Sequence, residues 1–213
     1  MILERIVLAR RRDTFAAALA SLRLRASRGE FVPGRSVVVV DEARRLRMSH
    51  TPVREALACL CGEGLIERSP SEGFLYPRLD VAVVRDRLRF RSTLLQMSVE
   101  VRALASADPG REALSPLTAL HQELARLVRA HGDAAVYDAY RRVSGQLAPL
   151  RTAERRILPD GEAEASALLA VLSTGDRSDR LSALEAYHAR RIEAAPRLLL
   201  DLEGDRLFHP GKG

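Results

Sequence analysis

The chain has 213 residues, which is enough for one large domain or two small ones. With 46% hydrophobic and 29% charged residues, it has the composition of a globular protein and not of a disordered chain. No apolar run approaches the length of a membrane span, and Cys59 and Cys61 fit neither a disulfide framework nor a zinc clamp. We therefore expect a cytoplasmic protein without a membrane partner.

The net charge of +6 is spread unevenly along the chain. Residues 1–78 hold 14 Arg against 9 Asp and Glu, whereas residues 79–213 hold 20 basic against 19 acidic residues. A basic segment beside a nearly neutral one indicates a module that binds a polyanion, joined to a different module. The alternative is a solvated basic surface without a partner.

The first elements in the chain are a helix and a short strand. Apolar residues recur with helical periodicity over 15–26. Asp13 or Thr14 is placed to cap the start of this helix, and Gly29 to end it. The run SVVVV at 36–40 favours a short strand, because β-branched side chains are stiff.

Two more helices and a hairpin complete the basic segment. A short helix is predicted over 41–48 and a third helix over about 49–61, ending at a glycine. Residues 65–77 have the pattern of a β-hairpin, with two short apolar runs around Ser-Pro-Ser-Glu-Gly. Helix, turn, helix and hairpin on a basic segment is the pattern of a winged helix-turn-helix.

The third helix has one apolar and one polar face. Spacing of i, i+3, i+4 and i+7 predicts a buried stripe of Val53, Ala56, Leu57 and Leu60. Ser49 is placed to cap the helix, and Pro52 is tolerated in its first turn. This N-terminal end would present free N–H donors to a phosphate, and Arg54, one turn in, could reach a base edge.

After Pro77 the sequence predicts only helices, separated by turns such as LPDG at 158–161. We expect a mainly α protein, with a winged helix-turn-helix domain over 1–78 and an antiparallel helical bundle over 79–213. The predicted helices of the bundle cover roughly 80–107, 112–131, 134–156, 161–174 and 177–200.

The stretch MSHTPVREALACLCGEGLIERSPSEGF, residues 48–74, resembles the signature of the GntR family of bacterial transcription regulators. There the pattern is Ser-Arg-Thr-Pro-Val-Arg-Glu-Ala-Leu, then Leu, Glu-Gly-Leu and a wing-tip Gly. Upstream, GEFVPGRSV and ARRLRMS resemble the family's Gly-x-Leu-x-Pro-Gly-x-x-Leu and Leu-Ala-x-x-Leu-Gly-Val-Ser. An all-helical second domain is similar to that of the FadR-like subgroup.

The resemblance implies a set of DNA contacts and also shows departures from the family. His50 stands where the family has its first recognition-helix Arg, Val40 replaces an Arg early in the second helix, and Glu42 replaces an apolar residue. We therefore expect an operator that differs from the family's common ones. The residues expected at the DNA are Arg35, Arg44, Arg45, Ser49, His50, Thr51, Pro52, Arg54, Arg68 and Gly73.

FadR-like domains resemble one another in holding a divalent metal through an Asp, a His four residues later and two more His. Here Asp133 and Asp138 are followed at that distance by Tyr137 and Arg142, and only His188 matches a later ligand. Three or four ligands are needed to hold such an ion firmly. We therefore expect no metal and no cofactor.

In the family the helical domain binds a small metabolite, often a carboxylate, and forms the dimer. Arg91 fits the Arg of the family's first helix, although Leu95 replaces the Glu that follows it. His121 and His131 are expected to face solvent. The candidate effector-binding residues are Arg91, Tyr137, Arg141, Arg142 and His188.

The sequence holds no catalytic constellation, phosphate-binding loop or dinucleotide fingerprint, so we do not expect an enzyme. The reading favoured by the resemblance is a metabolite-responsive repressor that binds double-stranded DNA as a homodimer at a pseudo-palindrome. One alternative is a DNA-binding protein whose helical domain only dimerises or binds a protein partner. Another is an enzyme with a basic accessory segment.

Overall fold

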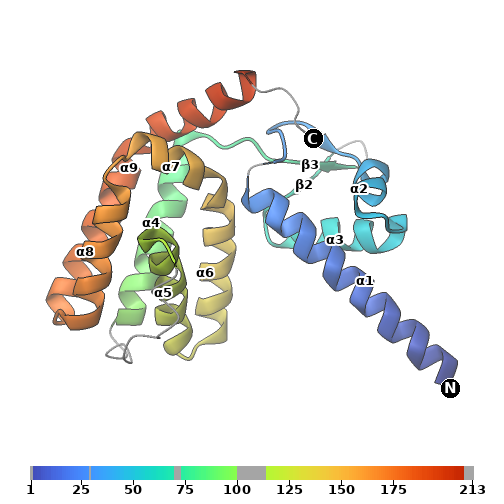
Figure 1. Ribbon diagram of the computed structural model, residues 1–213, viewed down its shortest axis with the longest axis horizontal. Helices are drawn as coiled ribbons and strands as arrows, with labels where there is room; N and C mark the ends of the chain where they lie inside the picture. Colours follow the sequence, from blue (N-terminus) through green and yellow to red (C-terminus); the bar gives the residue numbers. More distant parts are fainter. Residues whose placement is uncertain (1, 29, 70–72, 100–113, 209–213) are drawn as a thin grey trace. The chain divides into compact units, whose positions relative to one another are not determined.

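The computed structural model describes the chain except residues 1, 29, 70–72, 100–113 and 209–213 (Figure 1). The chain divides into two compact units between Leu79 and Asp80, called here the N-terminal unit and the helical unit. The predicted class, mainly α with a small antiparallel sheet next to a helical bundle, is confirmed. Within the described residues, no helix has the length and apolar character needed to cross a membrane.

The N-terminal unit is a three-helix core with a three-stranded sheet. The sheet is antiparallel in the order β1-β3-β2, with Ser36 and Glu67 both paired to Leu75. The elements are α1 (Ile2–Ser27), β1 (Ser36–Val37), α2 (Val39–Leu46), α3 (His50–Gly62), β2 (Glu67–Arg68) and β3 (Phe74–Leu75).

Two predicted boundaries in this unit are wrong. The first helix does not start at Asp13 or Thr14, because α1 runs through them from Ile2. The predicted strand over 36–40 is only two residues long, and α2 begins at Val39. Val39 packs against the core from α2, so tertiary packing overrides the β propensity of the valine run.

The predicted apolar stripe of α3 is confirmed, because Val53, Ala56, Leu57 and Leu60 are all fully buried. Leu22 of α1 is buried in the same core, and Phe74 of β3 closes it. Burying this stripe fixes which face of α3 remains at the surface, and that face carries His50, Thr51 and Arg54.

The helical unit is a bundle in which α4 packs against α5, α6 and α9, while α8 packs against α5 and α9 (Figure 1). The predicted helix over 134–156 is interrupted by a 3-10 turn, η2, which contains Pro149; proline lacks the N–H that a continuous helix would need. The elements are α4 (Val81–Val99), α5 (Pro116–Ala130), α6 (Ala134–Leu147), η2 (Ala148–Leu150), α7 (Arg151–Ile157), α8 (Gly161–Thr174) and α9 (Arg177–Phe208).

Candidate nucleic-acid interface and effector cavity

The N-terminal end of α3 is exposed and carries no acidic residue in its first turn. Ser49 occupies the N-cap position with extended backbone angles, but its side chain does not form the predicted capping hydrogen bond. Ser49, His50 and Thr51 are exposed together with Arg54. The positive end of the helix dipole and these polar groups form a surface suited to a phosphate.

Arg54 stands one turn into α3 on the exposed face. Its guanidinium forms no hydrogen bond or ion pair with any residue that the structure describes. Because Arg54 has no ion pair with a described residue to break, its guanidinium is available to contact a base or a phosphate. Arg54 therefore meets the geometric requirement for a reading residue.

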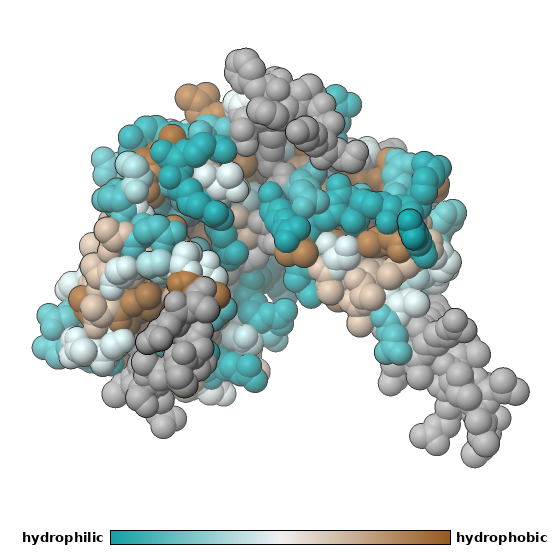
Figure 2. Space-filling model, viewed as in Figure 1, coloured by the Kyte–Doolittle hydropathy of each residue, from teal (hydrophilic) through white to brown (hydrophobic). Residues whose placement is uncertain are grey.

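Four further predicted arginines are exposed around this helix. Arg44 pairs with Asp41 at 3.5 Å, and Arg45 donates from Nε to Glu42 at 3.0 Å. The Arg44–Asp41 pair is exposed on both sides and therefore weak, so it can be exchanged for a phosphate contact, whereas Arg45 pairs with a buried carboxylate. Arg35 is exposed in the loop before β1, and Arg68 lies over the Phe74 ring at 5.0 Å. Figure 2 shows hydrophilic side chains gathered over α2 in this unit.

Two predicted DNA contacts are placed less favourably. Pro52 is buried, so it faces the packed side of α3 and not the exposed one. Gly73 is half-buried at the start of β3, and most of the predicted wing tip, residues 70–72, lies outside the described residues.

Arg47 is an exposed residue that the predicted contacts omit. It ends α2 in the left-handed conformation, with φ of 53°, and it is the one described non-glycine residue with positive φ. Glycine adopts this conformation without strain, and the family pattern has Gly at this position. The Arg in place of that Gly is the sequence signal that could have pointed to Arg47.

The structure separates the predicted effector residues into two groups. Arg91 and His188 meet in the core of the helical unit, where Arg91 Nε donates to His188 Nε2 at 3.2 Å. Arg141 is exposed and pairs with Asp138 at 3.8 Å, and Tyr137 is half-buried with Arg129 over its ring. One shared site cannot therefore include all five residues, as the sequence had suggested.

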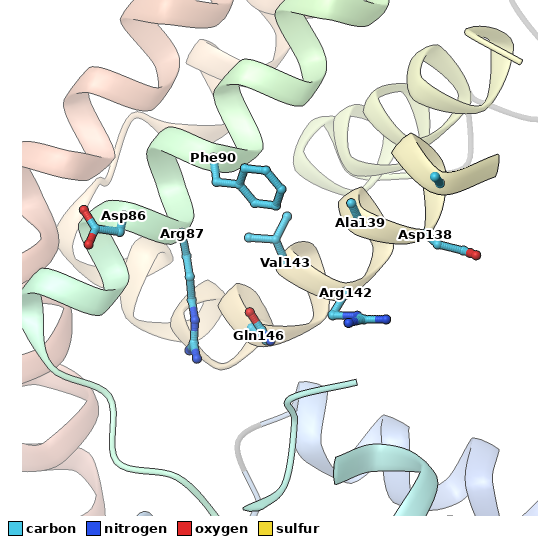
Figure 3. Close-up of a pocket in the computed structure, with 9 residues that line it drawn as sticks. Asp86, Arg87, Phe90, Asp138, Ala139, Arg142, Val143 and Gln146 are labelled. Atoms are coloured by element: carbon cyan, nitrogen blue, oxygen red, sulfur yellow. The ribbon is translucent and has the colours of Figure 1, made fainter. Parts of the chain in front are cut away.

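Arg142 lines an open groove of about 620 Å³ between α4 and α6 (Figure 3). Phe90 and Val143 form the apolar floor of this groove, with Phe90 48% exposed. Charges of both signs surround the groove: Asp86 and Arg87 from α4, and Asp138 and Arg142 from α6. A groove with balanced charges offers little net attraction to an anion.

A smaller cavity, of about 380 Å³, lies among α5, α7 and α8. Its lining includes His121 from α5 and Arg151 and Glu154 from α7. His121 was expected to face solvent, but burial first, then Arg151 and Arg91, lower its pKa to about 3. The prediction for His121 is therefore wrong, and His131 is also partly buried.

Arginines gather in the core beside this cavity. Burial lowers the pKa of Arg151, and the charge of Arg91 adds to that effect. Burial also lowers the pKa of His188 to about 3, again with a contribution from Arg91. Arg191 is 1% exposed and donates to Glu154 at 3.0 Å and to Glu164 at 2.9 Å. Sequence reasoning missed Arg151 and Arg191, because nothing local marks them as inward-facing.

The N-terminal unit thus has the winged helix-turn-helix arrangement with the start of α3 exposed, and it is followed by an all-helical unit that contains a polar cavity. No family model matches the chain. Over 78 residues the chain is 32% identical to the Nta operon transcriptional regulator of Aminobacter aminovorans, which is 37% of each protein. The chain thus matches little more than a third of the length of this curated relative.

Solved structures of the same fold cover most of the chain. McbR/YncC of E. coli is similar over 86% of this chain and 97% of its own, at 18% identity and a TM-score of 0.65. A transcriptional regulator described as GntR from Rhodococcus sp. RHA1 is similar over 85% and 97%, at 16% identity and a TM-score of 0.71. The solved structures show that the chain shares their fold, and the sequence match over 78 residues is to a transcriptional regulator.

Proposed function

We propose that the protein is a sequence-specific DNA-binding repressor that responds to a metabolite. The observation that carries this proposal is the exposed N-terminal turn of α3, which bears Arg54 without an intramolecular partner among the described residues. The curated relative and the structure from Rhodococcus support it, since both are described as transcriptional regulators.

In this proposal α3 lies in the major groove. Arg54 reads a base edge, most simply the two acceptors of a guanine. Ser49, Thr51 and the first N–H groups of α3 contact phosphates, and His50 supplies a weaker donor than the family's Arg. Arg35, Arg44, Arg45 and Arg68 add phosphate contacts that fix the orientation without reading sequence.

One winged helix makes a small interface with DNA, so tight binding requires two half-sites. We propose that two copies pair through the α4–α6 groove around Phe90. Each of the two helices carries one acidic and one basic residue at this groove, so a two-fold axis can place opposite charges of the two copies next to each other. These residues are Asp86 and Arg87 on α4, and Asp138 and Arg142 on α6. The operator would then be a pseudo-palindrome.

The effector would bind in the cavity lined by His121 and Arg151. A cavity of about 380 Å³ is the size of a small-molecule site. The alternative is that the helical unit only dimerises or binds a protein partner. A small molecule that changes the affinity for DNA would distinguish the two proposals, since only a helical unit with an effector site would respond to it.

The direct test is a binding selection on random double-stranded DNA with the purified full chain. A pseudo-palindromic site is expected, with an affinity that falls about 10³–10⁵-fold between 50 and 200 mM salt if the dimer neutralises roughly 6–10 phosphates. Recovery of no preferred sequence would reject the proposal. Metabolite pools added to the selected site then test the response to an effector.

A further inference from the structure

Pro196 stands inside α9, on the exposed side of that helix. Proline has no backbone N–H, so the hydrogen bond that residue 196 would donate to the carbonyl four residues earlier cannot form. That carbonyl belongs to Ile192. A proline inside a helix also bends it, and α9 changes direction along its length (Figure 1). The helix therefore consists of two segments that meet at Pro196, and we call their junction the Pro196 bend.

The carbonyl of Ile192 accepts its hydrogen bond from another helix instead. Arg85 of α4 donates from Nε to this oxygen at 3.2 Å. Arg85 and Ile192 are both half-buried, so the contact is partly shielded from water. A guanidinium is a charged donor, and hydrogen bonds from charged donors are stronger than those between neutral groups. Arg85 thus supplies the donor that Pro196 lacks, from a position 107 residues away in the chain.

Arg85 lies close to the point where the chain passes from one unit to the other. The boundary falls between Leu79 and Asp80, and α4 follows directly. Asp80 fixes the start of α4, because its side chain accepts from the backbone N–H of Val83 at 2.8 Å. A shift of Ile192 would therefore act, through Arg85, on the part of the helical unit that is covalently joined to the N-terminal unit.

The residue before Ile192 connects α9 to the cavity among α5, α7 and α8. Arg191 is 1% exposed and donates from Nε to Glu154 of α7 at 3.0 Å. Glu154 also lines the cavity. A change at the cavity wall is thus one ion pair and one peptide bond away from the carbonyl that Arg85 holds.

Helix α7 contacts α9 on both sides of the Pro196 bend. Before the bend, Glu154 accepts from Arg191, and after it, Asp201 accepts from Nη2 of Arg156 at 2.6 Å. These two ion pairs tie both segments of α9 to the same short helix. A movement of α7 would therefore change the angle between the two segments.

A second polar contact between α4 and α9 lies deeper in the core. Arg91 Nε donates to His188 Nε2 at 3.2 Å, and His188 Nδ1 lies 2.7 Å from the backbone oxygen of Leu184, so the ring proton sits on Nδ1. The lone pair that the divalent metal of FadR-like domains would need is thus occupied by a guanidinium N–H. Among the described residues, no three His, Cys, Asp or Glu side chains are grouped to hold a metal ion. The protein's own side chains therefore fix this end of the α4–α9 contact.

We propose that Arg85 is a positioning residue that holds the Pro196 bend of α9 to the start of α4, and that this contact carries the regulatory response from the cavity to the N-terminal unit. This role depends on the proposed function, because it presupposes a chain that binds DNA and responds to an effector. A ligand that disturbs the Glu154–Arg191 pair moves the residue next to Ile192, and the hydrogen bond from Arg85 passes that movement to α4.

The test is a double-mutant cycle on the full chain with Arg85→Ala and Pro196→Ala. Amide hydrogen exchange in α5 and α8 gives the unfolding constant of the helical unit in each variant. In the wild-type background Arg85→Ala should raise this constant about 10-fold, because the Ile192 carbonyl loses its donor. With Pro196→Ala present it should raise the constant about 2-fold or less, because residue 196 then donates within α9. Arg85→Lys keeps a charged donor, so its effect should be smaller than that of Arg85→Ala.

Pro116→Ala is the matched control for the proline substitution. Pro116 occupies the first turn of α5, where N–H groups have no intrahelical partner, so its replacement restores no hydrogen bond. Arg85→Ala should keep its full effect in this background. Arg89→Ala is the control for the arginine, since Arg89 lies one turn further along α4 and its ion pair with Asp86 is exposed on both sides. Its effect should be small, and equal with and without Pro196.

Two further measurements separate a regulatory contact from a merely structural one. Pro196→Ala should speed the hydrogen exchange of the Val84 amide, which donates to the Asp80 carbonyl at 3.0 Å at the start of α4. Fluorescence anisotropy should show that Pro196→Ala and Arg85→Ala change the affinity for the selected operator in the same direction, by about 2- to 30-fold. The double variant should change it no more than either single variant does.

Equal effects of Arg85→Ala with and without Pro196 would overturn the inference, since the guanidinium would then not serve the Ile192 carbonyl. Unchanged operator affinity in both single variants would also overturn it, because the contact would then be structural only. If the wild-type chain selected no operator at all, the proposed function would be rejected and the regulatory role with it. The hydrogen-exchange cycle distinguishes that result from a wrong assignment of the Arg85 contact.

Discussion

Glu42 on α2 forms an ion pair with Arg25 on α1, and at 7% exposure it is one of the few buried carboxylates of the chain. It also accepts from Arg45 Nε at 3.0 Å. The family pattern has an apolar residue at this position, and the structure explains the departure. Arg25 and Arg45 together neutralise the buried carboxylate, so an ionic contact replaces a hydrophobic one between these two helices.

Removing this carboxylate should destabilise the N-terminal unit. Glu42→Ala leaves Arg25 without its buried partner, and we expect a loss of about 2–3 kcal/mol in the free energy of unfolding. Amide hydrogen exchange in α2 and α3 measures this unit separately. Asp41→Ala is the control: its pair with Arg44 is exposed, so a loss below about 1 kcal/mol is expected. Equal losses in the two variants would contradict a structural role for Glu42.

Arg54→Ala should weaken binding to the selected operator by roughly 1–3 kcal/mol and relax the preference at one symmetric base pair. The physical reason is the loss of an exposed Arg that faces no intramolecular partner in the described chain. Fluorescence anisotropy with operator variants measures both effects. Arg197→Ala, on the helical unit, should change neither. If Arg54→Ala bound the operator with unchanged affinity and unchanged base preference, Arg54 would not contact a base.

Arg47→Gly should separate stability from DNA binding. Glycine relieves the left-handed strain of about 1 kcal/mol, partly offset by its greater freedom in the unfolded chain, so the N-terminal unit should gain roughly 0.5 kcal/mol at most. Loss of one guanidinium from each half-site should reduce the slope of log affinity against log salt by about 2 per dimer. A more stable variant with an unchanged salt slope would show that Arg47 makes no phosphate contact.

Phe90→Glu should dissociate the proposed dimer, because it places a charge in the apolar floor of the α4–α6 groove. Sedimentation velocity should show a monomer at concentrations where the wild-type chain is a dimer, and operator affinity should fall with it. Leu200→Glu is the matched control, since Leu200 is an exposed apolar residue on α9, 72% exposed. A dimeric Phe90→Glu variant would place the interface elsewhere.

The helical unit should lose stability as the pH falls through the ordinary range of histidine. His121 and His188 have a folded-state pKa of about 3, against 6.5 without burial. Below pH 6.5 the two histidines are protonated in the unfolded chain but stay neutral in the folded chain. The free energy of unfolding is therefore highest above pH 6.5 and decreases as the pH falls towards 3.

Urea unfolding between about pH 7 and pH 5 measures this effect, with an expected slope approaching 1.4 kcal/mol per pH unit for each histidine below about pH 6. His188→Gln keeps a donor and an acceptor but does not titrate, so it should halve the slope. The same slope in His188→Gln as in the wild-type chain would contradict the neutral, buried state of His188.

The recognition helix could be predicted from the sequence because its signals are local. The spacing of Val53, Ala56, Leu57 and Leu60 selects the buried face whatever the rest of the chain does, and the same periodicity located the helices after Pro77. Local signals failed where packing competes with them. Val39 and Val40 became helical although valine favours strands, and Ser49 occupies the cap position without the capping hydrogen bond.

The cavity among α5, α7 and α8 could not be located in this way. Sequence position suggested Arg141 and Arg142, but α6 turns Arg141 to the surface and Arg142 into the α4–α6 groove. Tertiary structure alone brought Arg91 to His188 across 97 residues, and Arg151 to the same core from α7. The periodicity of a sequence predicts which face of a helix is buried. Which buried side chains from different helices contact one another depends on how the helices pack. The sequence by itself thus determined the architecture of the N-terminal unit, and only the packing of the bundle decided which charges share its core.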